Sequence, residues 1–229
     1  MVSLMKSMVS LMKSMVSLMK HLSTSPYIKV DGQIWSIKAN PAKGHSIYTK
    51  QMKSIINQIN IMCSNYRRVF WIVFDLHLPQ GSYTACNEKI SQFMKSVSPA
   101  IKSKYAVKEI GYCWCREMEK AKQQHYHFMI MLDGKAIRHS DTLFNILSQH
   151  WEKASHGGKA WMPKNCFGNI LEAAFDEKQK LIDRVSYQAK GRGKGYRDSQ
   201  AKDYNTSRLK KRCMLSNAKS TLKCKPDKS

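Results

Sequence analysis

The sequence is poor in acidic residues and lacks the features of several protein classes. It has 16 Asp and Glu against 39 Lys and Arg, which gives a formal net charge of +23. No stretch approaches the roughly 18 uninterrupted apolar residues that a membrane helix requires. No small-residue cleavage site follows the N-terminal region. We therefore expect a cytoplasmic protein that does not enter a membrane.

The cysteines also lack the spacing that would define a disulfide framework or a metal ribbon. There are seven of them, an odd number, and no two form a CxxC pair. This argues against a disulfide-stapled scaffold and against a zinc ribbon. Because 42% of the 229 residues are hydrophobic, the chain can bury a core without such staples. We expect the thiols to be reduced.

The excess of positive charge predicts a polyanionic partner. Nucleic acid is the first candidate, and an anionic membrane surface is the second. The charge is concentrated toward the end of the sequence, where 13 Lys and Arg from Lys190 onward stand against 3 Asp. Few large apolar residues occur there. We therefore expect residues 195–229 to form a basic tail that is disordered until it meets phosphate.

The sequence begins with a tandem repeat. The unit MVSLMKS starts at Met1, Met8 and Met15, so each of the three methionines is a candidate start. As heptads the copies place Val, Leu and Met along one stripe, and a short coiled coil is one interpretation. The other interpretation is a dispensable leader over residues 1–26, and this is the one that we expect.

Hydrophobic periodicity predicts a mixture of helices and strands between these two ends. Residues 27–38 alternate around Asp31-Gly32, the pattern of a small hairpin. The predicted helices span 47–66, 87–103, 140–155 and 177–190, and the predicted strands span 69–78, 107–118, 125–132 and 167–171. Asp176 and Gln179 are placed to form a capping box for the last helix. This order favours an α+β domain over residues 27–194, with helices packed on an antiparallel sheet of about five strands.

The first candidate for chemistry lies on the predicted strand 125–132. Side chains two residues apart in a strand share a face, so His125 and His127 project together. If Glu117 pairs with His125 across the predicted hairpin, its carboxylate joins the same face. Two imidazoles and one carboxylate form a set that binds divalent metals. Surface or hydrogen-bonded histidines would give the same sequence pattern.

A second pair of polar residues ends the predicted strand 69–78. Asp75 and His77 are two apart and therefore share a face. If this strand is adjacent to the histidine strand, either residue can replace or support Glu117 in the metal set.

The second candidate is the pair Tyr187 and Lys190, three residues apart on the predicted helix 177–190 and hence on one face. A phenol, with a pKa near 10, is a poor nucleophile at neutral pH. It becomes effective when a metal polarises the phosphate that it attacks and when a cation helps to position the reacting groups. The alternative is a partly buried helix tyrosine beside a solvated lysine.

Together these elements resemble a known superfamily, the HUH endonucleases. HYHF at 125–128 matches the histidine strand of that superfamily, and YQAK at 187–190 matches its tyrosine helix. More closely, the sequence is similar to the inovirus gene-two-protein-like replication initiators, also described as the YagK/YfjJ C-terminal domain. The segments that carry this likeness are RVFWIVFDLHLP at 68–79, the helix start at 87–93, YCWCRE at 112–117, HYHFMIMLDG at 125–134 and YQAKGRGK at 187–194. It covers about residues 27–194, and Gln188 stands where an aliphatic residue is expected.

The resemblance implies a ferredoxin- or RRM-like sheet in which His125, His127 and Glu117 hold a divalent Mg²⁺ or Mn²⁺ ion. Tyr187, assisted by Lys190, would attack a phosphate of single-stranded or cruciform origin DNA. The products would be a 5′-phosphotyrosyl link and a free 3′-hydroxyl that the host replication machinery extends. Such a protein initiates rolling-circle replication of a phage, prophage or plasmid.

Three other functions remain open from the sequence. A transposase or a plasmid-transfer relaxase uses the same nicking chemistry. A non-catalytic DNA-binding or regulatory protein of a prophage would keep the charge without the chemistry. A non-haem iron oxygenase also uses two histidines and a carboxylate, but it has no use for a charge of +23. The oligomeric state is likewise left open.

Overall fold

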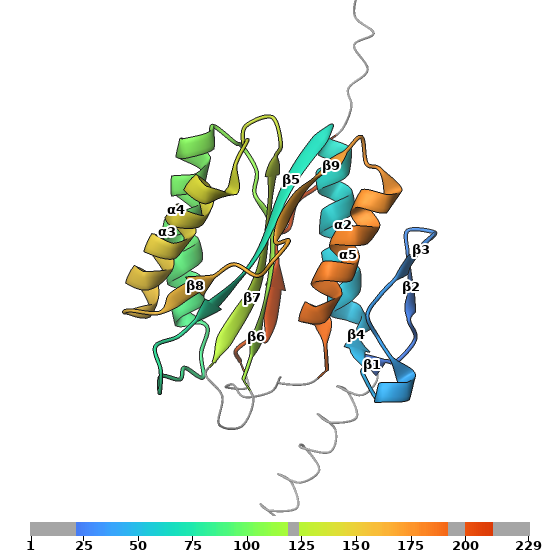
Figure 1. Ribbon diagram of the computed structural model, residues 1–229, viewed down its shortest axis with the longest axis horizontal. Coiled ribbons are helices and arrows are strands. Elements are labelled where there is room, and N and C mark those ends of the chain that lie inside the picture. Colours follow the sequence, from blue (N-terminus) through green and yellow to red (C-terminus); the bar gives the residue numbers. More distant parts are fainter. Residues whose placement is uncertain (1–21, 119–123, 192–199, 213–229) are drawn as a thin grey trace, which may run out of the picture.

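The protein is described by a computed structural model over residues 22–118, 124–191 and 200–212. The heptad repeats lie outside the described residues. An antiparallel sheet forms the middle layer, with two helices on each face (Figure 1). One face carries α2 (Thr49–Asn65) and α5 (Phe175–Ser186), and the other carries α3 (Glu88–Tyr105) and α4 (Ser140–Ser155). The predicted α+β class is confirmed.

Six strands make up the main sheet, and every pairing in it is antiparallel. In spatial order they are β10 (Tyr204–Thr206), β6 (Gly111–Glu117), β7 (His125–Asp133), β5 (Arg68–His77) and β8 (Lys159–Trp161), with β9 (Phe167–Leu171) also on β5. β9 pairs with the first half of β5 and β8 with its last residues. The predicted hairpin of β6 and β7 is therefore present, and β7 is an interior strand.

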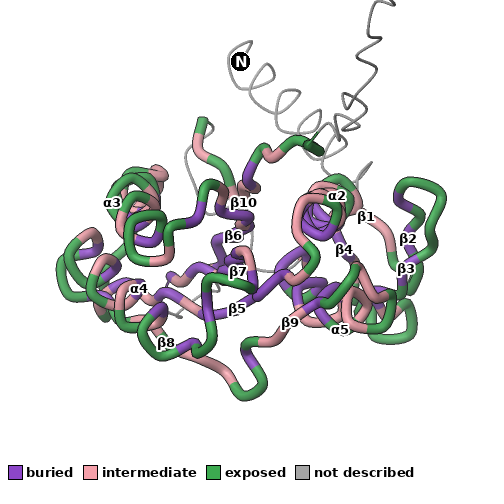
Figure 2. Tube along the Cα trace, turned by 90° about the horizontal axis from the view of Figure 1, so that it is seen from above, coloured by how far each residue is buried: buried purple, intermediate pink, exposed green. Residues whose placement is uncertain are grey.

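The residues of β7 explain its interior place. Both faces of the sheet are covered by helices, so a central strand must be apolar on both sides. Met129 and Met131 enter the hydrophobic cluster under α2 and α5, whereas Phe128 and Ile130 enter the cluster under α3 and α4. All four are at most 1% exposed. Two separate cores therefore lie on the two faces of one sheet. The view from above shows α3 and α4 on one side of the sheet and α2 and α5 on the other (Figure 2).

The predicted hairpin before the first helix is also confirmed. β2 (Tyr27–Val30) and β3 (Gln33–Ser36) pair antiparallel around Asp31-Gly32. Both turn residues have positive φ, 48° and 81°, which a two-residue hairpin turn of this kind requires. The hairpin packs against the α2/α5 layer, where Trp35 stacks on Phe175 with ring centroids 5.0 Å apart.

The last helix differs from its prediction. α5 runs from Phe175 to Ser186, and a 3₁₀ turn, η2 (Tyr187–Ala189), follows it. Its N-cap is Ala174, and Asp176 lies inside the first turn, so the predicted capping box is wrong. Gln179 is occupied elsewhere, because its side-chain amide pairs with the main chain of Ser36 in β3 at 3.1 and 3.0 Å.

The described structure crosses both expected domain boundaries. β1 (Leu22–Ser23), within the expected leader, pairs with β4 (Ile47–Tyr48). In the expected tail, β10 is an edge strand of the main sheet, and the main-chain carbonyl of Asp203 accepts a hydrogen bond of 2.7 Å from the Arg116 amide. The boundary expected at residue 194 is thus too early, because the chain returns to the sheet after it.

None of the helices in the described ranges combines the length and the apolar character that a bilayer crossing needs.

Candidate metal centre and tyrosine

The candidate site lies where three strands meet at one end of the sheet, on the face that carries α2 and α5. β6 ends there with Glu117, β7 begins with His125, and β5 ends with His77. Glu117 pairs directly with His125, which is the register that the sequence argument assumed. Asp75 pairs with His127 and His77 with His125 on the other side of β7. Paired residues of antiparallel strands share a face, so all five side chains belong to one surface.

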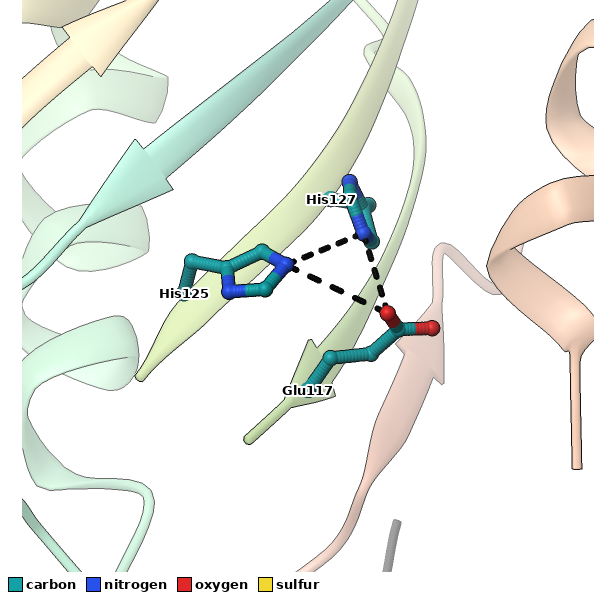
Figure 3. Close-up of side chains that lie close together, drawn as sticks. All are labelled: Glu117, His125 and His127. Carbon is teal, nitrogen blue, oxygen red and sulfur yellow. Dashed lines mark hydrogen bonds and ion pairs between the residues drawn. The ribbon is translucent and has the colours of Figure 1, made fainter. Parts of the chain in front are cut away.

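Glu117, His125 and His127 bring one ligand atom each to a common point, as Figure 3 shows. The Nε2 atoms of the two histidines are 3.2 Å apart. Glu117 Oε2 lies 3.3 Å from His127 Nε2 and 3.9 Å from His125 Nε2. Two nitrogens bound to one ion at about 2.1 Å lie roughly 3.0 to 3.4 Å apart, depending on the bond angle. The donor set and its spacing therefore fit a metal ion.

Asp75 is not one of these three, but it fixes the orientation of His127. Its Oδ1 atom is 2.6 Å from His127 Nδ1. Histidines that bind metals commonly donate the hydrogen of their second ring nitrogen to a carboxylate, which directs the first nitrogen at the ion. Asp75 thus supports the group instead of replacing Glu117.

Two carboxylates also determine the protonation of His127. Burial lowers the pKa of this imidazole, but hydrogen bonds and charge interactions with Asp75 and Glu117 outweigh burial and raise the pKa from 6.5 to about 9. Without an ion, the ring is an imidazolium held between two acids. A metal ion would take the place of the proton on Nε2, since ligands bind metals in their deprotonated form.

His77 completes the wall of the site without entering the ligand set. Its ring stacks on His125, with centroids 5.3 Å apart. Burial lowers the pKa of His77, and the neighbouring His125 lowers it further. Its main-chain carbonyl accepts a 2.9 Å hydrogen bond from the indole nitrogen of Trp151 in α4. His77 is therefore a neutral packing partner of His125.

Tyr187 reaches the same surface from α5. It is the first residue of η2, is 45% exposed, and its ring packs edge-on against His127 with centroids 5.4 Å apart. We predicted that Lys190 shares a helix face with Tyr187. In the structure, Lys190 instead follows the turn η2. Its ammonium nevertheless lies 3.0 Å above the centre of the Tyr187 ring. The tyrosine, the lysine and the histidine strand are thus brought together, although the helix that was to present them ends earlier.

Gln188 holds this turn in place, a role that sequence reasoning missed. The residue is 2% exposed. Its main-chain carbonyl accepts a 3.1 Å hydrogen bond from Gln51 Nε2 in α2, and its side-chain Oε1 accepts from Cys113 Sγ at 3.2 Å. The signal was available, because Gln188 continues the apolar spacing of Ile182 and Val185. A polar residue on an apolar stripe indicates a buried hydrogen bond.

The comparisons with known proteins give one match. A family model described as the YagK/YfjJ C-terminal domain matches residues 35–204. This range runs from β3 to the first residue of β10 and includes every candidate site residue. No curated protein and no solved structure matches the chain.

Proposed function

Because the chain belongs to the YagK/YfjJ C-terminal domain family, we propose that it is a replication initiator of the HUH endonuclease type that nicks single-stranded origin DNA through Tyr187. One observation carries the proposal. Tyr187, 45% exposed, packs on a histidine of a group made of two imidazoles and one carboxylate. We call Glu117, His125 and His127 the metal group. A nucleophile beside such a group is the arrangement that phosphoryl transfer to a side chain requires.

His125, His127 and Glu117 are the residues that would hold the ion. When bound, a divalent ion polarises the scissile phosphate and neutralises its charge. Mg²⁺ prefers oxygen ligands, whereas imidazoles suit transition metals better. Mn²⁺ is therefore the ion to test first, and Mg²⁺ the second.

Tyr187 supplies the chemistry that the chain itself performs. Its phenol oxygen attacks phosphorus, the bond from phosphorus to the 3′-oxygen breaks, and the phenol proton ends on that 3′-oxygen. The products are a 5′-phosphotyrosyl link and a free 3′-hydroxyl. The new bond retains the energy of the phosphodiester, so the same site can rejoin the strand without ATP. Lys190 orients the ring and adds positive charge beside the phosphate.

The charge of the chain supports DNA as the partner. A net charge of +23 attracts a phosphate backbone at long range. The substrate that we propose is single-stranded or cruciform origin DNA of a phage, prophage or plasmid. Host replication proteins would then extend the free 3′-end.

A covalent-adduct assay tests the proposal. Purified protein is incubated with Mn²⁺ and a pool of single-stranded fragments that tile the genomic region around its gene, each labelled at the 3′-end. The label stays with the fragment that carries the 5′-phosphate, so a protein-linked band appears on a denaturing gel. We expect this band from the wild type, and we expect EDTA to abolish it.

The Tyr187→Phe variant isolates the hydroxyl, because it keeps the aromatic ring that contacts His127 and Lys190. We expect no band from this variant, a loss of at least about 10³-fold. Tyr27→Phe, at a residue 62% exposed on the β2–β3 hairpin, serves as the matched control and should retain the band. Retained binding without an adduct under every divalent ion would favour the non-catalytic DNA-binding function instead.

A further inference from the structure

A second polar feature lies on the opposite face of the sheet from the metal group. It is a groove of about 470 Å³ between the last turns of α3, the start of β6 and the residues that follow β10. Its charged lining consists of Lys102, Lys108, Arg208 and Glu109. We call it the basic groove.

The negative charge in this lining is already engaged. Glu109 Oε2 accepts a hydrogen bond of 2.7 Å from Arg212 and one of 3.1 Å from the Tyr66 hydroxyl. By contrast, Lys102, Lys108 and Arg208 form no ion pair with a carboxylate of the described residues. The groove therefore presents three cations whose charges attract an anion from solution.

The wall that carries Arg208 is held firmly. The residue before it is Ser207, whose amide donates a 2.9 Å hydrogen bond to the Tyr112 carbonyl and whose hydroxyl oxygen accepts a 3.1 Å hydrogen bond from the Tyr112 amide. The Ser207 hydroxyl also donates to Gln58 Oε1 in α2 at 2.6 Å. Arg208 thus leaves a fixed point on the sheet edge, so less main-chain freedom is lost when its guanidinium binds a ligand.

The position of the groove relative to Tyr187 restricts what can bind both. Tyr112 pairs with Ile130, which places it on the α3/α4 face, whereas Glu117 lies five residues along β6 on the other face. At about 3.3 Å per residue the two points are roughly 17 Å apart. Among the described residues, β10 is the edge strand on that side of the sheet (Figure 2). An extended polyanion can pass around this edge, but a small one cannot reach both places.

We propose that the basic groove binds the phosphodiester backbone of the DNA strand at several nucleotides from the phosphate that Tyr187 attacks. Arg binds phosphate through paired hydrogen bonds, and Lys binds it as a point charge. The inference rests on the proposed function only for the identity of the polyanion as DNA. It adds a site that holds the strand independently of the metal.

The test measures binding without metal or cleavage. A fluorescently labelled 40-nucleotide single strand of mixed sequence is titrated with protein in EDTA at several salt concentrations. The groove variant carries Lys102→Ala, Lys108→Ala and Arg208→Ala. The control variant carries Lys29→Ala, Lys164→Ala and Lys180→Ala, which removes the same charge from exposed positions elsewhere. Thermal melting confirms that both variants are folded.

Each phosphate contact on a single strand contributes about 0.7 to the slope of log affinity against log salt. We expect the groove variant to lose about 2 units of slope and at least about tenfold in affinity at 0.1 M salt. The control should lose less than about one unit of slope. Equal losses in the two variants would overturn the inference, since the three cations would then act only through net charge.

The outcome can be separated from that of the adduct assay. A groove-specific loss of slope without any adduct would support the groove and contradict the nicking function. An adduct combined with equal slopes would support nicking and remove the groove. If tripolyphosphate raises the melting temperature of the wild type but not of the groove variant, while the DNA slopes of both variants stay equal, the groove takes a small polyanion and the inference is wrong.

Discussion

The two faces of the sheet differ most at the end where the metal group lies, although the same strands build both. On the α3/α4 face, Leu76, Trp114 and Tyr126 are at most 4% exposed. One residue away on each strand, Asp75, Cys115 and His127 occupy the α2/α5 face. A single alternation of side chains therefore separates a closed core from the face that carries the candidate metal centre.

The helices account for this difference. α4 covers the end of the sheet, because Trp151 contacts Tyr126 with ring centroids 5.7 Å apart. On the opposite face α5 ends at Ser186, and among the described residues the turn η2 continues from it. There Tyr187 packs on His127. At this end of the sheet, the longer helix α4 covers the closed core, and the shorter helix α5 ends beside the candidate metal centre.

The largest expected effect comes from a core change beside the histidines. Phe128 is fully buried and stacks on Phe74 with centroids 5.2 Å apart. Phe128→Ala should lower the free energy of unfolding by about 3 to 5 kcal/mol, because it leaves a cavity. Urea denaturation measures this loss. The folded variant should still gain thermal stability from Mn²⁺.

The counterpart on the other face is His125→Ala. The His125 side chain is 19% exposed, so its removal leaves no closed cavity and should cost less stability than Phe128→Ala. It should abolish the Mn²⁺-dependent rise in melting temperature. If Phe128→Ala also abolished the Mn²⁺-dependent rise in melting temperature, the assignment of metal binding to the α2/α5 face alone would be refuted.

Asp75→Asn should weaken Mn²⁺ affinity by about 10 to 100-fold, because it removes the carboxylate that orients His127. Calorimetric titration measures the affinity. Asp141→Asn, at an exposed residue at the start of α4, removes the same charge from the other face. An equal loss in this control would assign the effect to general charge instead of orientation.

Trp151→Phe should lower the free energy of unfolding by about 1 to 2 kcal/mol, since it removes the hydrogen bond to the His77 carbonyl and some packing volume. This bond joins α4 to the end of β5. We also expect a small loss of Mn²⁺ affinity, less than that of Asp75→Asn. A larger loss would show that the α3/α4 face controls the ligand geometry.

The smallest effect is expected at Gln188, whose Nε2 atom is buried and has no hydrogen-bond partner among the described residues. Gln188→Leu should leave the unfolding free energy unchanged or raise it by up to about 1 kcal/mol, because it removes this unpaired group. Gln51→Leu also removes an unpaired buried atom, Oε1. It should nevertheless lower the unfolding free energy by about 1 kcal/mol, since the Gln188 carbonyl then loses its donor. Chemical denaturation of both variants checks this difference in sign.

Much of the site could be predicted because it depends on local rules. The alternation of residues 125–132 placed His125 and His127 on one face, and a short connection implied the β6–β7 hairpin. The register that pairs Glu117 with His125 was an assumption, and the structure confirms it. Strand periodicity and chain proximity were sufficient for these three residues.

The rest depends on contacts between segments that are distant in the sequence. Asp75 reaches His127 only because β7 lies between β5 and β6, an order that the chain sequence does not specify. β10 and β8 have three residues each, too few to show a period. Lys190 reaches Tyr187 through a turn that Gln51 ties to α2. Gln188 on its apolar stripe indicates a buried hydrogen bond, but it does not indicate that the partner is Gln51.

The direct pairing of Glu117 with His125 makes metal binding sensitive to strand register. A slip of one residue between β6 and β7 would turn Glu117 to the opposite face, because side chains alternate. An ion that requires all three ligands would bind the correctly paired sheet and not the slipped one. By mass action it would then favour the correct pairing during folding, in proportion to the ratio of its concentration to its dissociation constant. The bound ion would thus favour the correct register of the β6–β7 hairpin over the slipped one.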